Sequence, residues 1–467
     1  MGFGTLNNPS LGTHGLQLHA ASEKKLQLTD ERFRQFFDSN RAFAVPAERQ
    51  NTAQQFNLQT PFQVKGFDGL FPLLKKIQIP MENYDLYLPT HLIFGRGRID
   101  ELPSLLPAKG SRILLAMGGG SIRRIGLYDK LRELLSDYEV FDFSGIEPNP
   151  KISTIRRAVD LCKAQKIDYI VAAGGGSVID AVKCIAAGAY YDGDPWDLVL
   201  DHSRIGRAIP FCAVLTLSAT GSDYDNSGVI SNSETNEKMF LAASNLFPQV
   251  SILDPTYTFT VPANQTAAGS ADIISHTFEQ YLVKEGNPFT DAMCEGVLRT
   301  VFEYTPKAIA APDDYEARAQ LMMVSSFGCC GLLSIGRTPS PWPCHGMEHE
   351  ISAFYDITHG VGLAILTPNW MRWSLTPETA PRFAQYGVRV WHLNPQDDVM
   401  TNAQKAIEKT AEFFKSIGLP SKLSEVGIDD KHFEEMADHV AKIWWSFDGA
   451  LRPISRSGVL EILRMSL

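Results

Sequence analysis

Short apolar runs alternate with amphipathic stretches in the part of the chain between residues 84 and 191. Runs such as RILLAMGGG and DYIVAAGGGS have the length of buried strands, whereas STIRRAVDLCKAQK has the spacing of a helix. Alternation of this kind predicts a parallel sheet covered by helices, an α/β fold. We expect strands within 87–95, 112–120, 139–146 and 168–177, and helices within 127–135, 153–166 and 178–191.

The pattern changes near Pro262. Beyond this residue long stretches with helical periodicity dominate, and runs of β-branched residues are few. We expect helices over 265–283, 290–309 and 402–418 in a second domain that is all-α. The predicted organisation is an α/β domain over residues 81–262 and a helical domain over residues 263–467.

Residues 1–80 differ from the rest of the chain in composition and charge. They carry nine Lys and Arg against six Asp and Glu, and the segment TDERFRQFFDSN places phenylalanines on one helical face behind the capping residue Thr29. We treat them as an N-terminal extension that could dock on the rest of the chain, a partner subunit, a shell or a membrane surface. The alternatives are a disordered leader, an expression fusion, or translation from a start upstream of Met81.

Composition limits the class of protein. The chain has 467 residues, 44% of them hydrophobic and 21% charged, as in soluble proteins of two or three domains. The net charge of −10 argues against nucleic acid as the main partner. The seven cysteines form no CxxC pair, and no run reaches about 18 apolar residues, so we expect free thiols, no transmembrane segment and a cytoplasmic location.

Three glycines end the expected strand in DYIVAAGGGSVIDAVK. Gly174, Gly175 and Gly176 precede Ser177, which opens the next expected helix. Glycine lets the backbone approach a pyrophosphate, and a helix N-terminus offers free N–H groups and a positive dipole end. The turn predicts a phosphate cradle, although neither the GxGxxG spacing nor a P-loop lysine is present. The alternative is a tight turn that binds no ligand.

A second glycine cluster bears on the choice of nucleotide. In ILLAMGGGSIRR, glycines and a serine occupy the positions where an acidic residue could otherwise stand. An acidic residue there would accept hydrogen bonds from a ribose 2′-hydroxyl but would repel a 2′-phosphate. Arg123 and Arg124 follow and could pair with that phosphate. The cluster therefore favours NADP over NAD. The alternative is that both arginines lie on a solvated helix face.

Five side chains suited to metal binding lie in fewer than about ninety residues of the helical region. Asp272 and His276 are four apart, which places both on one helix face, and His345 and His349 have the same relation; His359 follows at a turn. Imidazole and carboxylate together suit Zn²⁺ or Fe²⁺ rather than Mg²⁺ or Ca²⁺. Taken singly, each histidine is more often structural than a ligand.

Several segments together resemble the iron-containing alcohol dehydrogenase superfamily, and within it the NADPH-dependent butanol dehydrogenase and aldehyde reductase branch. They occur in matching order from about residue 81 to the C-terminus: IEPNP, GGGSVID, DPWDL, LTLSATGS, LDPTYT, MEHE and YDITHGVGLAI. The resemblance implies a dehydroquinate synthase-like architecture, with a catalytic cleft between a nucleotide-binding α/β domain and a helical domain. It also implies a homo-oligomer, commonly a dimer.

The resemblance assigns roles to individual residues. The metal ligands for Fe²⁺ or Zn²⁺ fall on Asp272, His276, His345 and His359. The NADP(H) contacts fall on Gly118, Gly119, Gly120, Ser121, Gly175, Gly176, Ser177, Asp180, Thr216, Leu217 and Lys238. His349 matches a cleft histidine that is not a ligand, and its place one turn after His345 makes it our candidate catalytic proton donor. One departure is Asp223, where the family commonly has Glu.

The expected reaction is hydride transfer between NADPH and a small apolar aldehyde such as butanal, with a divalent ion as Lewis acid. Trp342, Phe354 and Tyr355 lie near the ligand cluster in sequence and favour an apolar substrate, although core packing is the commoner fate of such residues. Two alternatives remain. One is an NAD-dependent polyol dehydrogenase of the glycerol type. The other, a dehydroquinate synthase-type lyase, needs cleft cations that the sequence supplies only sparsely.

Overall fold

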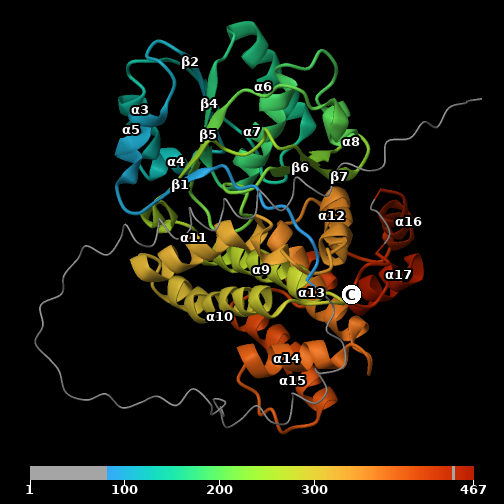
Figure 1. The fold of residues 1–467 in the computed structure, drawn as a ribbon. Helices are drawn as coiled ribbons and strands as arrows, with labels where there is room; N and C mark the ends of the chain where they lie inside the picture. Colours follow the sequence, from blue (N-terminus) through green and yellow to red (C-terminus); the bar gives the residue numbers. More distant parts are fainter. Residues whose placement is uncertain (1–80, 444–446) are drawn as a thin grey trace, which may run out of the picture. The chain divides into compact units, whose positions relative to one another are not determined.

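A parallel sheet forms the centre of the first half of the described chain (Figure 1). The structure is a computed structural model and describes residues 81–443 and 447–467, so the docking prediction for residues 1–80 lies outside the described residues. The sheet has the strand order β1-β8-β5-β4-β2-β3, and all neighbouring strands are parallel. The strands are β1 (His91–Phe94), β2 (Arg112–Met117), β3 (Glu139–Phe143), β4 (Tyr169–Gly174), β5 (Phe211–Leu215) and β8 (Val250–Leu253).

Both faces of this sheet are buried. On β2, Ile113 and Leu115 belong to one hydrophobic core, whereas Leu114 and Ala116 belong to another. Successive side chains of a strand point to opposite faces, so a strand that is apolar at every position must be covered on both sides. This explains why the central strands read as continuous apolar runs, and it confirms the predicted α/β class.

Helices cover the two faces. In Figure 1, α3 (Leu102–Leu105), α4 (Ser121–Arg124) and α5 (Leu127–Leu134) lie to the left of the sheet, and α6 (Ile152–Gln165) and α7 (Gly176–Gly188) lie to its right. The short helix α8 (Trp196–Leu200) follows α7. The helices predicted over 127–135, 153–166 and 178–191 are therefore present as α5, α6 and α7, with ends that differ by at most three residues.

An antiparallel hairpin that the sequence pattern did not predict completes this half. Strands β6 (Ser227–Asn232) and β7 (Glu237–Ala242) pair through the turn SETN, in which Asn236 has a φ of +52°. Its short segments carry no long apolar run, because only part of each strand is buried. The hairpin matters for the site, since β6 packs on α7 and β7 packs on α12 (Pro343–Tyr355) of the helical half.

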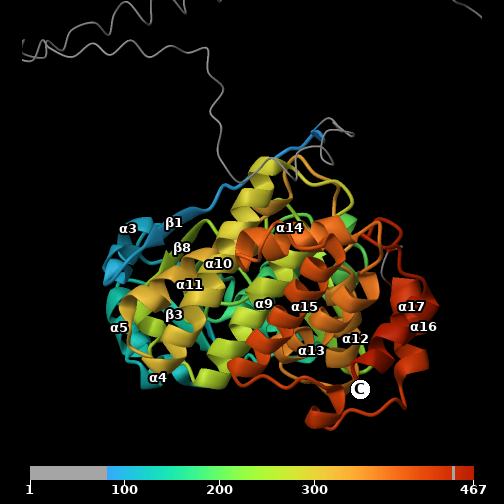
Figure 2. The ribbon, with the colours of Figure 1, turned by 90° about the horizontal axis from the view of Figure 1, so that it is seen from below.

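The second half is helical, as predicted. Figure 2 shows α9 (Ala263–Tyr281) among α10 (Pro288–Ala310), α11 (Tyr315–Cys329) and α13 (His359–Ser374), and all three pack against it. The predicted helices 265–283, 290–309 and 402–418 correspond to α9, α10 and α15, and α10 begins early because the side chain of Asn287 caps it. The C-terminal part of this half contains α14 (Ala380–Val390), α15 (Val399–Ser416), α16 (Phe433–Ile443) and α17 (Arg456–Met465).

Short 3-10 turns connect several of these elements: η1 (Arg98–Glu101), η2 (His202–Arg204), η3 (Pro255–Thr258), η4 (Leu332–Ser334) and η5 (Leu423–Val426). Among the described residues, no helix combines the length and the apolar character that a membrane crossing requires.

Candidate metal centre and nucleotide cleft

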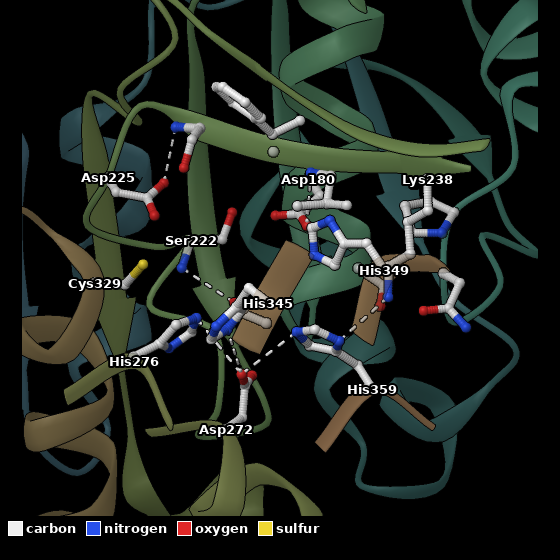
Figure 3. Close-up of a pocket in the computed structure, with 18 of the residues that line it drawn as sticks. Asp180, Ser222, Asp225, Lys238, Asp272, His276, Cys329, His345, His349 and His359 are labelled. Carbon is white, nitrogen blue, oxygen red and sulfur yellow. Dashed lines mark hydrogen bonds and ion pairs between the residues drawn. The ribbon is translucent and has the colours of Figure 1, made fainter. Parts of the chain in front are cut away.

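The four predicted metal ligands come together from three helices. Asp272 and His276 lie one turn apart on α9, His345 lies in the first turn of α12, and His359 is the first residue of α13. Their imidazole rings point toward the Asp272 carboxylate (Figure 3). All four are buried or nearly so, with side-chain exposures of 4% for Asp272 and 21% for His359.

The spacing of the ligand atoms fits a single metal ion. Oδ1 of Asp272 lies 3.5 Å from Nε2 of His276, 3.7 Å from Nε2 of His345 and 3.6 Å from Nε2 of His359. Ligand atoms about 2.1 Å from a tetrahedral ion are about 3.4 Å apart. Asp272 Oδ1 and His345 Nε2 are also buried without a hydrogen-bond partner among the described residues. Buried polar atoms normally have partners, so these orphans fit a cation.

The ionisation of the cluster also fits a cation site. Burial raises the pKa of Asp272, but its histidine neighbours outweigh this and hold the pKa well below the usual range. Burial lowers the pKa of His276 to about 3, which leaves a neutral imidazole able to ligate. Burial also opposes the charged form of His345, yet Glu279 and Asp272 raise its pKa to about 9. Without an ion, a proton on His345 offsets part of the negative charge.

Two carboxylates behind the ligands were not predicted. Glu279 on α9 contacts Nδ1 of His345 and accepts hydrogen bonds from the backbone N–H groups of Cys344 at 2.5 Å and His345 at 3.2 Å. Glu348 on α12 contacts Nδ1 of His359. The sequence shows one sign of this role, because Glu279 and Glu348 each lie among buried positions of a helix. The partner of each carboxylate lies on another helix, which sequence spacing does not show.

Lys238 lies in this part of the site rather than at the glycine turns. It projects from β7, and its Nζ is 3.4 Å from Oε2 of Glu348 and 3.3 Å from Nδ1 of His359. Its side chain is 4% exposed. The lysine that the resemblance assigned to the cofactor therefore contacts the metal ligand shell, at the wall of the same cavity.

His349 lies beside the cluster without joining the four ligand atoms around Asp272. Its ring centroid is 6.2 Å from that of His345 and 5.4 Å from that of His359. Burial, followed by the nearby positive charge of Lys238, holds the pKa of His349 well below its ordinary value. A neutral imidazole at the cavity wall can accept a proton at one ring nitrogen, and the catalytic role of this residue stays a prediction.

At the glycine turn after β4, side chains of a neighbouring loop lie very close to the backbone. Gly175 is the N-cap of α7, which begins at Gly176, one residue before the predicted start at Ser177. A Cβ on Gly176 would lie 2.2 Å from Oγ1 of Thr220, and one on Gly175 would lie 3.2 Å from the Leu217 side chain. The loop that contains Thr216 and Leu217 therefore packs directly on the turn, and a side chain at Gly176 would push it away.

A cavity of about 330 Å³ connects the turn with the metal ligands. Of the predicted cofactor residues, Ser177, Asp180 and Lys238 line it together with His349 and the four predicted ligands. Asp180 also accepts a hydrogen bond from the Val229 N–H at 3.1 Å, and burial raises its pKa to about 6. The other predicted cofactor residues lie outside this lining: Gly118, Gly119, Gly120, Ser121, Gly175, Gly176, Thr216 and Leu217.

The turn after β2 lies next to the turn after β4, because β2 and β4 are neighbours in the sheet. Cβ atoms built on Gly118 and Gly174 would both contact the Val178 side chain. Gly120 has a φ of +119°. Arg123 is engaged within the chain, since its guanidinium lies 3.5 Å from the Tyr128 ring centroid and 3.9 Å from the Asp142 carboxylate.

A buried lysine holds in place the loop that joins β5 to β6. Lys183 on α7 is fully buried and donates to Ser222 Oγ at 2.8 Å, to Asp225 Oδ1 at 2.5 Å and to the Ser227 carbonyl at 2.6 Å. No pattern in the sequence predicted this role for Lys183. Asp223, the departure from the family pattern, is buried in the same loop, where Ser326 Oγ donates to it at 2.5 Å.

Aromatic residues near the ligands divide into two groups. Trp342 lines the cavity and packs edge-on against the rings of His276 and His345, with centroid distances of 5.9 and 5.4 Å. Phe354 and Tyr355, which we expected near the ligands, pack instead against His432 at the far end of α12. For these two residues the alternative of core packing is correct.

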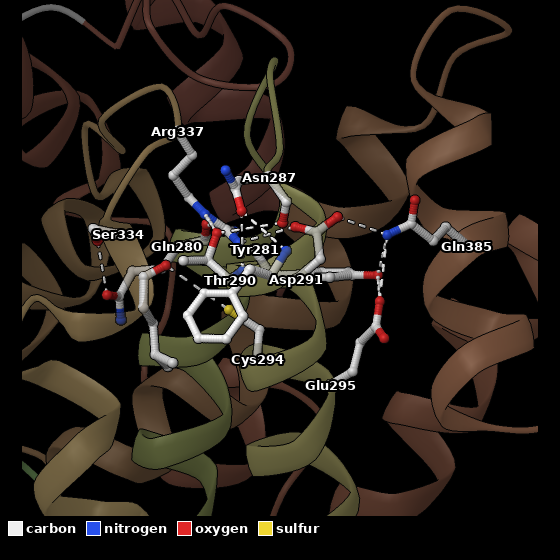
Figure 4. A network of polar contacts seen from close by, with 12 residues as sticks. Gln280, Tyr281, Asn287, Thr290, Asp291, Cys294, Glu295, Ser334, Arg337 and Gln385 are labelled. Atoms are coloured by element: carbon white, nitrogen blue, oxygen red, sulfur yellow. Dashed lines mark hydrogen bonds and ion pairs between the residues drawn. The ribbon is translucent and has the colours of Figure 1, made fainter. Parts of the chain in front are cut away.

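A buried polar network fixes the end of the helix that carries Asp272 and His276 (Figure 4). Nη2 of Arg337 lies 2.9 Å from Oδ1 of Asp291, and its Nη1 donates to the carbonyl of Gln280 at 2.5 Å. Arg382 binds the same aspartate and the carbonyl of Tyr281. The network ties the C-terminal end of α9 to α10 and α14, which restrains the ligand helix against rotation.

Comparison with known proteins decides the family. The family described as iron-containing alcohol dehydrogenase matches residues 89–255, and its C-terminal counterpart matches residues 266–467. The chain belongs to the iron-containing alcohol dehydrogenase family. A relative from Clostridium acetobutylicum, NADH-dependent butanol dehydrogenase A, is 49% identical over 389 residues, which are 83% of this chain and all of the relative.

Other members of the iron-containing alcohol dehydrogenase family agree in sequence and fold. The NADPH-dependent aldehyde reductase YqhD of Escherichia coli is 38% identical over 75% of this chain and 90% of its own length. A crystal structure of NADH-dependent butanol dehydrogenase A from Thermotoga maritima superposes with a TM-score of 0.78 at 34% identity, covering 83% of this chain and 99% of that one. The family places this chain among alcohol dehydrogenases and aldehyde reductases that use a nicotinamide cofactor and a divalent metal.

Proposed function

We propose that this chain interconverts small apolar aldehydes and their alcohols with NADP(H), using Fe²⁺ or Zn²⁺ bound by Asp272, His276, His345 and His359. The observation that carries the proposal is the convergence of three Nε2 atoms within 3.5–3.7 Å of one buried carboxylate oxygen, in a cavity that continues to the Gly175–Ser177 turn. A divalent ion held there would act as a Lewis acid toward the substrate carbonyl oxygen.

The cavity wall supports an uncharged substrate. Its lining includes Trp342, Phe240 and Val229, and Lys238 is the only Lys or Arg in the lining among the described residues. That lysine is paired with Glu348, so it is not available to hold a substrate carboxylate or phosphate. The same observation weighs against the lyase alternative, whose substrate requires several cations.

His349 is placed to handle the proton that the reaction requires. Reduction of a carbonyl leaves negative charge on its oxygen, and the alcohol forms when that oxygen takes up a proton. His349 lines the cavity next to His345 and His359, so its neutral imidazole can give its N–H proton to the substrate oxygen in reduction while its other ring nitrogen takes up a proton, and the reverse transfer serves oxidation. Trp342 lines the same cavity and packs edge-on against the rings of His276 and His345.

The preference for NADP(H) rests on the turn after β2. The turn from Gly118 to Ser121 carries no carboxylate, and Cβ atoms on Gly119 and Gly120 would meet no atom within 4 Å, which leaves room for a phosphate. Asp142 is the nearby acid, and its charge is offset by Arg123 at 3.9 Å and Arg132 at 3.4 Å. NAD(H) is the second candidate, because relatives at 49% and 46% identity are named NADH-dependent.

Steady-state kinetics tests the proposal. We expect the kcat/KM for butanal with NADPH to exceed that with NADH by at least about tenfold, and NAD-linked glycerol oxidation to be far slower. Gly119→Asp should reduce the use of NADPH by more than about tenfold, because a carboxylate repels the 2′-phosphate, while Gly119→Ser, the uncharged control, should not. Equal use of NADH, or a preference for it, would refute the cofactor assignment. Efficient glycerol oxidation would favour the polyol alternative.

The location and assembly of the protein belong to the same proposal. All seven cysteines are free, and six of them are buried, in keeping with a reducing compartment such as the cytoplasm. We further propose a homo-oligomer, and docking through residues 1–80 remains a prediction. Gel filtration with light scattering, on the full chain and on a chain that begins at residue 81, measures both.

A further inference from the structure

We propose that Glu348 is a positioning residue that holds the ligand His359 in its metal-binding orientation and strengthens the binding of a divalent cation. The inference rests on the proposed metal site and goes beyond its four ligands. Glu348 itself does not reach Asp272. It acts through the imidazole of His359, whose Nδ1 contacts Oε2 of Glu348 while its Nε2 faces Asp272 Oδ1 at 3.6 Å.

The contacts of Glu348 fix its carboxylate in one place. It is fully buried on α12, its Oε1 accepts a hydrogen bond from Ser352 Oγ at 2.5 Å, and Lys238 Nζ lies 3.4 Å from its Oε2. A Cβ on Gly362 would lie 2.8 Å from this side chain, so α13 packs directly over it. A carboxylate held by these contacts leaves the Nδ1–H of His359 a single direction in which to donate, which sets the tautomer and the ring plane.

The ligand histidines differ in whether a carboxylate contacts their Nδ1 atom. His345 has a similar partner in Glu279, but that carboxylate also accepts the backbone N–H groups that begin α12, so its loss would disturb the helix itself. Nδ1 of His276 is buried and has no hydrogen-bond partner among the described residues. Glu348 is therefore the supporting carboxylate whose effect on the metal can be separated from an effect on helix α12.

The charges around the site match a divalent ion. Asp272, Glu279 and Glu348 are buried carboxylates, and Lys238, which is paired with Glu348, is a buried ammonium group. With neutral histidines, the carboxylates carry two more negative charges than Lys238 offsets. Uncompensated buried charge is unfavourable, and one divalent cation removes this excess. Replacing Glu348 by glutamine removes one of these charges and keeps the shape of the side chain.

Metal affinity, measured on the full chain after chelation, tests this role independently of turnover. Zn²⁺ is titrated in competition with a chromophoric chelator, and the d–d absorption of bound Co²⁺ reports ligand geometry. We expect Glu348→Gln to weaken Zn²⁺ binding by about ten- to a hundredfold and to change the Co²⁺ spectrum. Ser352→Ala, which removes one hydrogen bond to the carboxylate and no charge, should weaken binding by a smaller factor.

Glu350→Gln is the matched control. Glu350 lies on the same helix with an exposure of 1%, but it contacts Nδ1 of His439 on α16 rather than a metal ligand. We expect its Zn²⁺ affinity within about twofold of the unaltered protein. The proposal is overturned if Glu348→Gln and Ser352→Ala both bind Zn²⁺ as tightly as the unaltered protein, or if Glu350→Gln loses as much affinity as Glu348→Gln. Failure of the unaltered protein to bind any divalent ion would overturn the metal site as well.

Discussion

Oδ1 of Asp272 lies 3.7 Å from Nε2 of His345, although the two residues belong to different helices, α9 and α12. Neither atom has a hydrogen-bond partner among the described residues. Two buried polar atoms that face each other without a hydrogen bond are costly unless an ion lies between them. The stability of the folded chain and the binding of a metal should therefore be coupled.

Asp272→Asn tests this coupling. The amide keeps the shape of the side chain but loses the charge that balances the cation, so metal content should fall by at least about tenfold and turnover should fall with it. Addition of Zn²⁺ should raise the thermal midpoint of the unaltered protein and leave that of the variant nearly unchanged. Metal analysis and thermal unfolding on the same samples measure both effects. Equal metal content in the two proteins would remove Asp272 from the ligand set.

His349→Ala separates proton transfer from metal binding. His349 lies beside His345 and His359 but outside the four ligands, so the variant should keep its metal. Loss of a positioned proton donor typically costs about a hundredfold or more in rate, and we expect kcat to fall by about that factor. His432→Ala, on a partly exposed histidine of the same domain that contacts none of the four ligands, is the control. Loss of metal from His349→Ala would instead make this residue a ligand.

Close packing of α9 and α13 places His359 next to Asp272. A Cβ on Gly360 would lie 1.9 Å from the Ala268 carbonyl oxygen on α9, so Gly360→Ala must move the two helices apart. We expect a lower thermal midpoint and metal binding weakened by at least about tenfold. Gly296→Ala, in the interior of α10 with open space around its Cβ, should instead stabilise by up to about 1 kcal/mol. Unchanged metal affinity in Gly360→Ala would contradict this account of the packing.

Asp223 gives a prediction about pH. Burial raises its pKa from 3.8 to about 6, so the folded chain binds this proton more tightly than the unfolded chain does. The stability that the protonated group contributes is fully present below pH 3.8 and is lost as the pH rises through about 6. Asp223→Asn should therefore be more stable than the unaltered protein at pH 7.5, by on the order of 3 kcal/mol, and should differ little near pH 4.

Urea unfolding at the two pH values measures the effect of Asp223→Asn. Asp160→Asn, on an exposed position of α6, is the control and should change stability little at either pH. If Asp223→Asn destabilises the protein at pH 7.5, the hydrogen bond from Ser326 contributes more than the buried charge costs.

Local patterns in the sequence predicted what depends on local geometry. The apolar runs predicted β1, β2, β3 and β4 of the parallel sheet but not β5 and β8, and the four-residue spacing of Asp272 and His276 placed both on one helix face, as observed. The hairpin β6–β7 was missed, because partly buried strands this short have no distinct hydrophobic pattern. Helix ends differed by a few residues where a side chain such as that of Asn287 caps the first turn.

The parts of the site that depend on contacts between helices could not be predicted. Glu279 contacts His345, and Lys238 contacts Glu348, only because α9, α12 and β7 pack together. Spacing along the chain carries no information on which carboxylate meets which histidine. The resemblance to a family supplied the ligand set and placed Lys238 with the cofactor, whereas the structure adds its contact with Glu348.

The most direct test of the account is NADPH oxidation with butanal before and after removal of the metal, with metal content determined on the same samples. We expect chelation to abolish turnover, and readdition of Fe²⁺ or Zn²⁺ to restore it in proportion to the metal bound by the site around Asp272. Full activity in a preparation that contains no metal would contradict the proposed function.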